Sequence, residues 1–150
     1  MKLMGIDLGQ ARTGVCVSDL SGFLAGRSIT ITEHARDRLL NAIQAEIDRE
    51  QPAKIVVGLP LNMNGTEGPK ALECREFAAQ LQEKCGLPVI LWDERGSSVT
   101  ANRILSDAGK KRGRQRARVD AVAAQVILQS YLDYCQLHKN KGKDAEDGIF

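Results

Sequence analysis

Three acidic residues stand where the surrounding sequence predicts buried structure. Asp7 ends an apolar stretch near the N-terminus, Glu94 follows the apolar run of residues 89–92, and Asp120 falls in the first turn of a predicted helix. An unpaired buried carboxylate is costly, and a divalent cation would remove that cost. Because Mg²⁺ prefers one or two carboxylates together with water and substrate phosphate, the three acids predict a shared metal site that acts on phosphates.

Each acid also has a plainer interpretation. Asp120 could favour the positive end of its helix, which contributes about 0.3 to 1 kcal/mol. Glu94 could pair with Arg95. Asp7 taken alone suits a metal, a salt bridge or a phosphate-binding loop equally well, so the spacing of the acids leaves these alternatives open.

A basic segment precedes the third acid. The stretch "GKKRGRQRAR", residues 109–118, holds six cations and no acid, whereas the whole chain has a net charge of +2. Such a segment predicts a polyanionic partner, most often nucleic acid, and the alternative is an ordinary solvated loop. The cations are Lys110, Lys111, Arg112, Arg114, Arg116 and Arg118.

Further phosphate-binding candidates lie outside this segment. Arg12 and Arg95 follow the first and second acids closely in the sequence. The loop "LPLNMNGTEG" precedes a predicted helix N-terminus, where free backbone N–H groups can receive a phosphate and Asn62 and Asn64 could donate as well. An ordinary Gly- and Asn-rich turn explains the same loop.

The elements that must position these residues alternate along the chain. Residues 2–8, 13–19 and 25–31 predict an antiparallel meander, and residues 54–60 and 87–94 predict parallel strands. Helices are predicted at about 35–50, 69–85, 97–109 and 118–138, the second with Ala71, Leu72, Phe77, Ala78 and Leu81 on one side. We therefore expect an α/β domain over residues 1–138, a mixed five-stranded sheet with helices on both faces, and a disordered polar tail over residues 139–150.

Composition limits the class of protein. No apolar run approaches the roughly 18 residues that span a bilayer, and the N-terminus lacks a signal-peptide pattern, so we expect a soluble cytoplasmic protein without a membrane partner. The four cysteines are scattered without a C-x-x-C pair. This spacing suits neither a zinc site nor a disulfide framework, and it predicts free thiols.

Four motifs in order resemble one family. They are "GIDLGQARTGVCVSD", "VVGLPLNMNGTEGPKA", "WDERGSSVTANRIL" and "VDAVAAQVILQSYLD", and together they extend from about residue 3 to 133. They resemble the YqgF/RuvX family of ribonuclease H-like proteins, described as pre-16S rRNA nucleases or Holliday junction resolvases. The resemblance implies a ribonuclease H-like fold and an active site of Asp7, Glu94 and Asp120. Gly96 departs from the family, which usually has a bulky apolar residue there.

The resemblance implies a metal-dependent nuclease that hydrolyses phosphodiester bonds. Two Mg²⁺ or Mn²⁺ ions about 4 Å apart would be held by the three acids, with Asp7 bridging both. The expected role is processing of the 5′ end of precursor 16S rRNA in ribosome biogenesis, with structured RNA and a pre-ribosomal particle as partners. An rRNA-trimming enzyme could act as a monomer, whereas a resolvase of four-way DNA junctions would be expected to work as a homodimer.

Two hypotheses come from other classes of protein. A non-catalytic nucleic-acid-binding factor in ribosome assembly could have kept the fold without the activity. The stretch "GIDLGQARTG" also resembles the first phosphate loop of the actin and sugar-kinase ATPases. Those proteins need two lobes and a second aspartate-glycine loop, and the sequence has room for one lobe and shows no second loop.

Overall fold

The computed structural model describes residues 1–94 and 115–138, and in the second stretch it describes side chains from residue 122 onward. The order of elements is the predicted one as far as these residues extend. The predicted helix over 97–109 and the predicted tail over 139–150 lie outside them. The elements are β1 (Leu3–Asp7), β2 (Arg12–Ser18), β3 (Ala25–Thr32), α1 (Arg36–Glu50), β4 (Lys54–Leu59), α2 (Pro69–Cys85), β5 (Val89–Asp93) and α4 (Gln115–His138).

The five strands form one mixed sheet in the order β3-β2-β1-β4-β5. β1, β2 and β3 form the predicted antiparallel meander, and β4 joins β1 and β5 in parallel. The mixed α/β architecture expected from the sequence is therefore confirmed. Because parallel strands end at the same edge of a sheet, the carboxyl ends of β1, β4 and β5 lie together.

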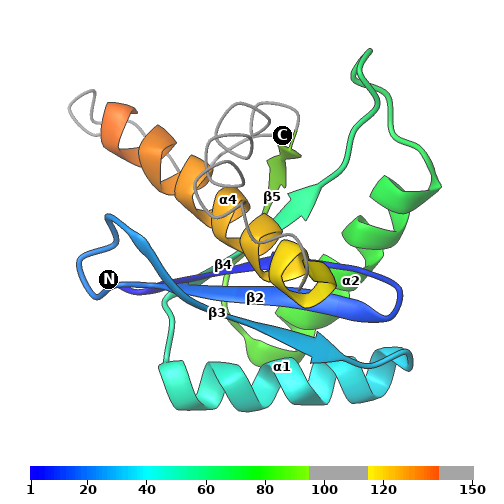
Figure 1. Ribbon diagram of the computed structural model, residues 1–150, viewed down its shortest axis with the longest axis horizontal. Coiled ribbons are helices and arrows are strands. Elements are labelled where there is room, and N and C mark those ends of the chain that lie inside the picture. Colours follow the sequence, from blue (N-terminus) through cyan, green and yellow to red (C-terminus); the bar gives the residue numbers. More distant parts are fainter. Residues whose placement is uncertain (95–114, 139–150) are drawn as a thin grey trace.

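Helices cover both faces of the sheet, with α4 on one face and α1 and α2 on the other (Figure 1). Side chains alternate along β1 as a strand requires: Met4 and Ile6 join the core under α1 and α2, whereas Leu3 joins the core under α4. Gly5 lies on the α4 face, where an added Cβ would stand 2.7 Å from Leu128 Cβ. The missing side chain lets α4 approach the sheet closely.

The α2 helix begins and ends as its sequence indicates. Pro69 opens it, and Gly86 caps it with a left-handed φ of 74°. The prediction that Leu72 belongs to the buried side is wrong, because its side chain is 58% exposed and Cys74 is buried instead. The reason is helical periodicity: Cys74 lies three residues after the buried Ala71, whereas Leu72 is turned about 100° from it.

All four cysteines are free thiols, with Cys16 and Cys74 buried and Cys85 and Cys135 half-buried. Among the residues with described placement, no helix combines the length and the apolar character needed to cross a membrane.

Candidate active site

Asp7 and Glu94 lie at the shared edge where β1, β4 and β5 end. Ile6 pairs with Val57, so continuing the parallel register brings Asp7 beside Gly58, and Gly58 in turn pairs with Trp92. Leu3 and Trp92 both pack in the core under α4, and side chains two residues apart share a face of the sheet. Asp7 and Glu94 therefore belong to the same face as α4.

The Glu94 carboxylate lies over Gly58. A Cβ built on Gly58 would stand 2.5 Å from Glu94 Oε2 and 3.0 Å from the carboxylate carbon. Glu94 directly follows the edge strand β5, so its side chain reaches back over β4 toward the strand that ends in Asp7. Two carboxylates from non-adjacent strands are thus brought toward each other.

Burial and neighbouring charges raise the pKa of Glu94 to about 7. Burial is the largest cause, the negative charge of Asp7 comes next, and Asp93 adds to both. The ammonium of Lys70 acts in the opposite direction and lowers the pKa. Burial and a second carboxylate together hold this carboxyl group half-protonated at neutral pH, and a bound cation would favour its ionised form.

The oxygen donors at this edge fit Mg²⁺ or Mn²⁺, which prefer carboxylates. Within residues 1–94 and the described part of α4, no three His, Cys, Asp or Glu side chains gather closely enough to hold a metal ion. Asp7 and Glu94 are the two predicted metal ligands whose placement is described, and the side chain of Asp120 lies outside the description.

The α4 helix packs against the sheet from Ala124 onward, one turn after position 120. The carbonyl oxygen of Ala124 stands 3.2 Å from a Cβ built on Gly5, and Ile127 Cδ1 stands 2.5 Å from a Cβ built on Gly58. Positions 120, 124 and 127 share one face of a helix. Leu132 packs in the same core as Leu3, at the start of β1, and Ala124 lies nearer the end of that strand. Going from Leu132 to Ala124 along α4 therefore leads toward Asp7, and position 120 is one turn further in that direction.

Trp92 fixes the end of β5 against α4. Its indole N–H donates to Ser130 Oγ at 3.1 Å, and its ring packs edge-on against Tyr131 with centroids 5.2 Å apart. Because Glu94 follows Trp92 by two residues, this contact also limits where the Glu94 backbone can lie.

Lys70 is a residue of this site that the sequence analysis missed. It lies exposed in the first turn of α2, directly after Pro69, and its charge acts on both Glu94 and the buried Cys74. Burial raises the pKa of Cys74 to about 12, and the charges of Glu94 and Asp7 contribute to that rise. The signal in the sequence was a lysine at the start of a helix that follows a parallel strand, because such a helix starts at the edge where the strand ends.

The predicted phosphate-binding asparagines hold their own loop together. Asn62 Nδ2 donates to Thr66 Oγ1 at 2.9 Å, and Asn64 Oδ1 accepts from the Thr66 hydroxyl at 2.7 Å. Leu61 and Glu67 bridge the base of the loop. Asn62 and Asn64 are both exposed beside the start of α2, so their predicted contact with phosphate stays a prediction.

The predicted basic contacts are only partly described. Arg12 is half-buried at the start of β2, next to the tight turn that follows Asp7. Gly9 makes that turn possible, since a Cβ there would overlap the carbonyl oxygen of Arg12. Arg116 and Arg118 belong to the first turns of α4, without described side chains, and the remaining cations lie outside the described residues: Arg95, Lys110, Lys111, Arg112 and Arg114.

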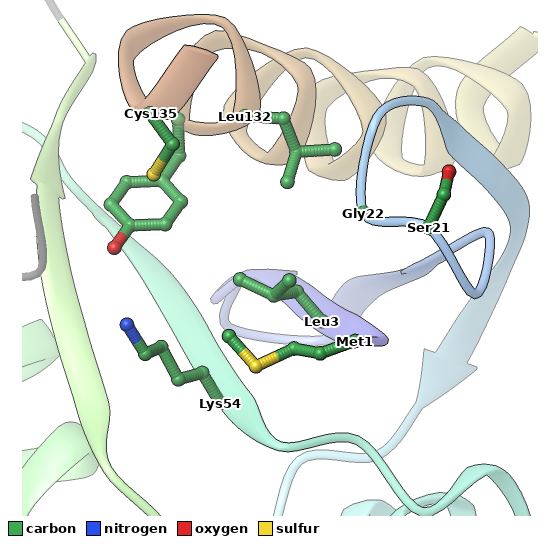
Figure 2. Close-up of a pocket in the computed structure, with 8 residues that line it drawn as sticks. Met1, Leu3, Ser21, Gly22, Lys54, Leu132 and Cys135 are labelled. Carbon is green, nitrogen blue, oxygen red and sulfur yellow. The ribbon is translucent and has the colours of Figure 1, made fainter. Parts of the chain in front are cut away.

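A cavity of about 150 Å³ opens at the other end of the sheet, where β1 and β4 begin. Figure 2 shows Leu3 and Lys54 on one side of it and Leu132 and Cys135 of α4 on the other. Asp7 and Glu94, the predicted catalytic residues with described side chains, do not line this cavity. The candidate active site is therefore separate from it.

Solved structures share the fold. Thermus thermophilus RuvC in complex with a Holliday junction substrate superposes with a TM-score of 0.64 at 14% identity, over 91% of this chain and 96% of that one. The yeast mitochondrial Holliday junction resolvase gives a TM-score of 0.60 at 12% identity, over 98% of this chain and 84% of that one. The chain thus has the ribonuclease H-like fold of these resolvases.

Sequence relatives are considerably more similar. A protein of Syntrophomonas wolfei named "Putative pre-16S rRNA nuclease" is 46% identical over 140 residues, which is 93% of this chain and 99% of that protein. A protein of the same name from Geobacillus kaustophilus is 47% identical over 135 residues, 89% of this chain and 98% of its own length. The sequence model of the family described as "RuvX: Holliday junction resolvase" matches residues 1–134. Because this match includes nearly the whole described fold, the chain belongs to the RuvX family.

Proposed function

We propose that this RuvX-family nuclease hydrolyses phosphodiester bonds in precursor 16S rRNA, at the 5′ end, with Mg²⁺ or Mn²⁺ held by Asp7, Glu94 and Asp120. The observation that carries the proposal is the placement of the Glu94 carboxylate over Gly58, on the strand next to the one that ends in Asp7. The names of relatives at 46 and 47% identity support precursor rRNA as the substrate.

The chain's own groups supply binding and orientation. Asp7 and Glu94 stand on the ends of hydrogen-bonded strands, so their carboxylates offer oxygen ligands from rigid supports. A bound divalent cation would supply an activated water and charge stabilisation for the leaving oxygen. Lys70, together with Arg12 at the turn after Asp7, would bind backbone phosphates and orient the strand.

The basic segment of residues 109–118 would bind backbone phosphates of the nucleic acid other than the phosphate that reacts. Its last residues, 115–118, belong to α4, the helix that carries position 120, so phosphates bound by Arg116 and Arg118 would lie close in the chain to the third acid. Contacts of this kind give affinity and register without reading the base sequence. A protein that trims precursor rRNA would act in the cytoplasm, on a pre-ribosomal particle.

A second candidate function is resolution of four-way DNA junctions. The specific observation in its favour is the fold shared with RuvC in complex with a Holliday junction, together with the description of the family. A resolvase makes paired symmetric cuts, so this function would require a dimer with two active sites. A non-catalytic role in ribosome assembly is the third candidate, and the pair of acids at one sheet edge argues against it.

One experiment separates these functions. Purified protein and its Asp7→Asn variant are incubated with precursor 16S rRNA and with four-way junctions in Mg²⁺, and the cut ends are mapped. Asp37→Asn serves as the matched control, because Asp37 is an exposed acid in the first turn of α1. We expect Asp7→Asn to abolish cleavage and to retain binding, with Asp37→Asn unchanged.

The pattern of cuts decides the substrate. Cuts near the mature 5′ end of the rRNA support the proposal, and paired symmetric cuts in the junction support a resolvase instead. Binding without any cut by the wild-type protein would make it a non-catalytic factor. Unchanged cleavage by Asp7→Asn would show that Asp7 is not a catalytic residue.

A further inference from the structure

We infer that Gly58 is a positioning residue of the active site: its missing side chain leaves the space over β4 that the Glu94 carboxylate occupies beside Asp7. The inference rests on the proposed metal-dependent cleavage, and it adds a residue that touches neither metal nor substrate. It also explains how the acids at the ends of β1 and β5 can approach each other across β4, which carries no acid.

Gly58 lies between the two acids in the sheet. It is buried, it pairs with Trp92 of β5, and the register of β1 with β4 places it beside Asp7. Adjacent strands are about 4.8 Å apart, so a carboxylate from β5 must cross the width of β4 to approach a carboxylate on β1. Any side chain at position 58 would stand in that path.

The space over Gly58 is already filled by two side-chain ends. A Cβ would stand 2.5 Å from Glu94 Oε2 and 2.5 Å from Ile127 Cδ1, closer than the roughly 3.5 Å at which non-bonded atoms attract one another. Both contacts involve the far ends of flexible side chains rather than backbone. An added methyl group would therefore be accommodated by movement of Ile127 and Glu94, and the cost would fall on the active site rather than on the fold.

Gly5 shows the contrasting, purely structural case. A Cβ there would stand 2.7 Å from Leu128 Cβ and 3.2 Å from the carbonyl oxygen of Ala124, which are parts of α4 that cannot turn aside. Gly5→Ala should therefore push the whole helix from the sheet and lower the melting temperature. Gly58→Ala should instead leave the fold largely intact while it displaces one carboxylate.

The test uses Gly58→Ala and the double variant Gly58→Ala with Ile127→Val. The second substitution removes Ile127 Cδ1, so it relieves one of the two clashes and leaves the clash with Glu94. Four properties are measured: Mn²⁺ affinity by calorimetry without nucleic acid, thermal unfolding in EDTA, the kcat of cleavage, and substrate binding in EDTA. Ile127→Val alone is the control for a smaller core side chain.

We expect both Gly58 variants to bind Mn²⁺ about tenfold or more weakly and to lose about 100-fold in kcat, because a displacement of about 1 Å at a reacting centre can cost that much. Substrate binding in EDTA should stay at the wild-type level. Ile127→Val should recover the melting temperature of Gly58→Ala without recovering Mn²⁺ affinity. A crystal structure of Gly58→Ala should show the Glu94 carboxylate moved from its place over β4.

Failure of this inference is distinct from failure of the proposed function. A wild-type protein that neither binds Mn²⁺ nor cleaves would overturn the proposed function. The position of Glu94 in crystal structures of the wild-type protein and of Gly58→Ala would still decide the role of Gly58. Wild-type Mn²⁺ affinity and kcat in the double variant, or an unmoved Glu94, would overturn the inference. Loss of folding in the double variant would overturn the inference as well, because it would show that Gly58 is needed only for packing of the core.

Discussion

Asp7 and Glu94 repel each other across the edge of the sheet, and the charge of Asp7 adds to burial in raising the pKa of Glu94 to about 7. The two acids come from the ends of β1 and β5, which β4 holds apart. A site that brings like charges together costs stability in the absence of a cation and recovers it when one binds. The free energy of unfolding and the metal affinity should therefore both depend on pH through the ionisation of Glu94.

Glu94→Gln should stabilise the metal-free protein at high pH. The pKa of Glu94 is about 7 in the folded state against 4.5 for an ordinary glutamate, so the folded state holds this proton more tightly and loses stability as the pH rises from about 4.5 to 7. Replacing the carboxyl group removes that loss, which is on the order of 3 kcal/mol. Urea unfolding in EDTA should show the gain at pH 8 and little difference at pH 4.5.

The matched control for this prediction is Glu76→Gln, because Glu76 is an exposed acid on α2. Its free energy of unfolding should change little at either pH. A gain in Glu94→Gln of the same size at pH 4.5 and pH 8 would contradict the role of ionisation.

Metal affinity should fall steeply below neutral pH. A cation must displace the proton of Glu94 before it can bind the carboxylate, so below a pKa of about 7 each unit of pH should weaken binding by up to about tenfold. Trp92 is the single tryptophan of the chain and lies two residues from Glu94, so its fluorescence can report a Mn²⁺ titration. Equal affinities at pH 6 and pH 8 would show that Glu94 does not bind the ion.

Lys70→Met should shift the pH dependence of cleavage upward. The ammonium of Lys70 favours the ionised form of Glu94, so its removal raises the pKa of Glu94 and leaves less carboxylate at neutral pH. Cleavage at pH 7 should fall several-fold, with a limit of about tenfold for each unit of pKa, and the loss should be smaller at pH 9.

Lys84→Met is the matched control, since Lys84 lies at the opposite end of the same helix. It should leave the pH–rate profile in place. If Lys70→Met reduced cleavage equally at pH 7 and pH 9, Lys70 would act as a phosphate ligand alone and not through Glu94.

Neutralising the basic segment should weaken nucleic-acid binding and reduce its dependence on salt. Each lost phosphate contact lowers the slope of log affinity against log salt by roughly 0.7 to 0.9. Replacing Arg112, Arg114 and Arg116 by Gln should therefore reduce the slope by about 2 to 3 for three such contacts. Binding is measured between 50 and 200 mM salt, roughly the range over which such contacts are usually compared. An unaltered slope would identify the segment as a solvated loop.

The sequence by itself determined the elements and their order. Strand and helix periods are local properties, so the meander, the parallel strands and the start of α2 at Pro69 could be predicted from short windows. The acids at positions 7 and 94 could be placed at strand ends for the same reason. The error at Leu72 arose because an exposed apolar residue directly follows the buried Ala71, whereas helical periodicity continues the buried side of α2 through Cys74.

Only the tertiary structure decided how the acids meet. The parallel pairing of β1, β4 and β5 sets which residue lies between Asp7 and Glu94. This register joins Leu3 with Lys54 and Ile55 with Val89, which are 51 and 34 residues apart in the chain and beyond the reach of any local pattern. The sequence pattern singled out neither Gly58 nor Lys70 as part of the site. Their roles follow from through-space distances and charges, which a linear sequence does not contain.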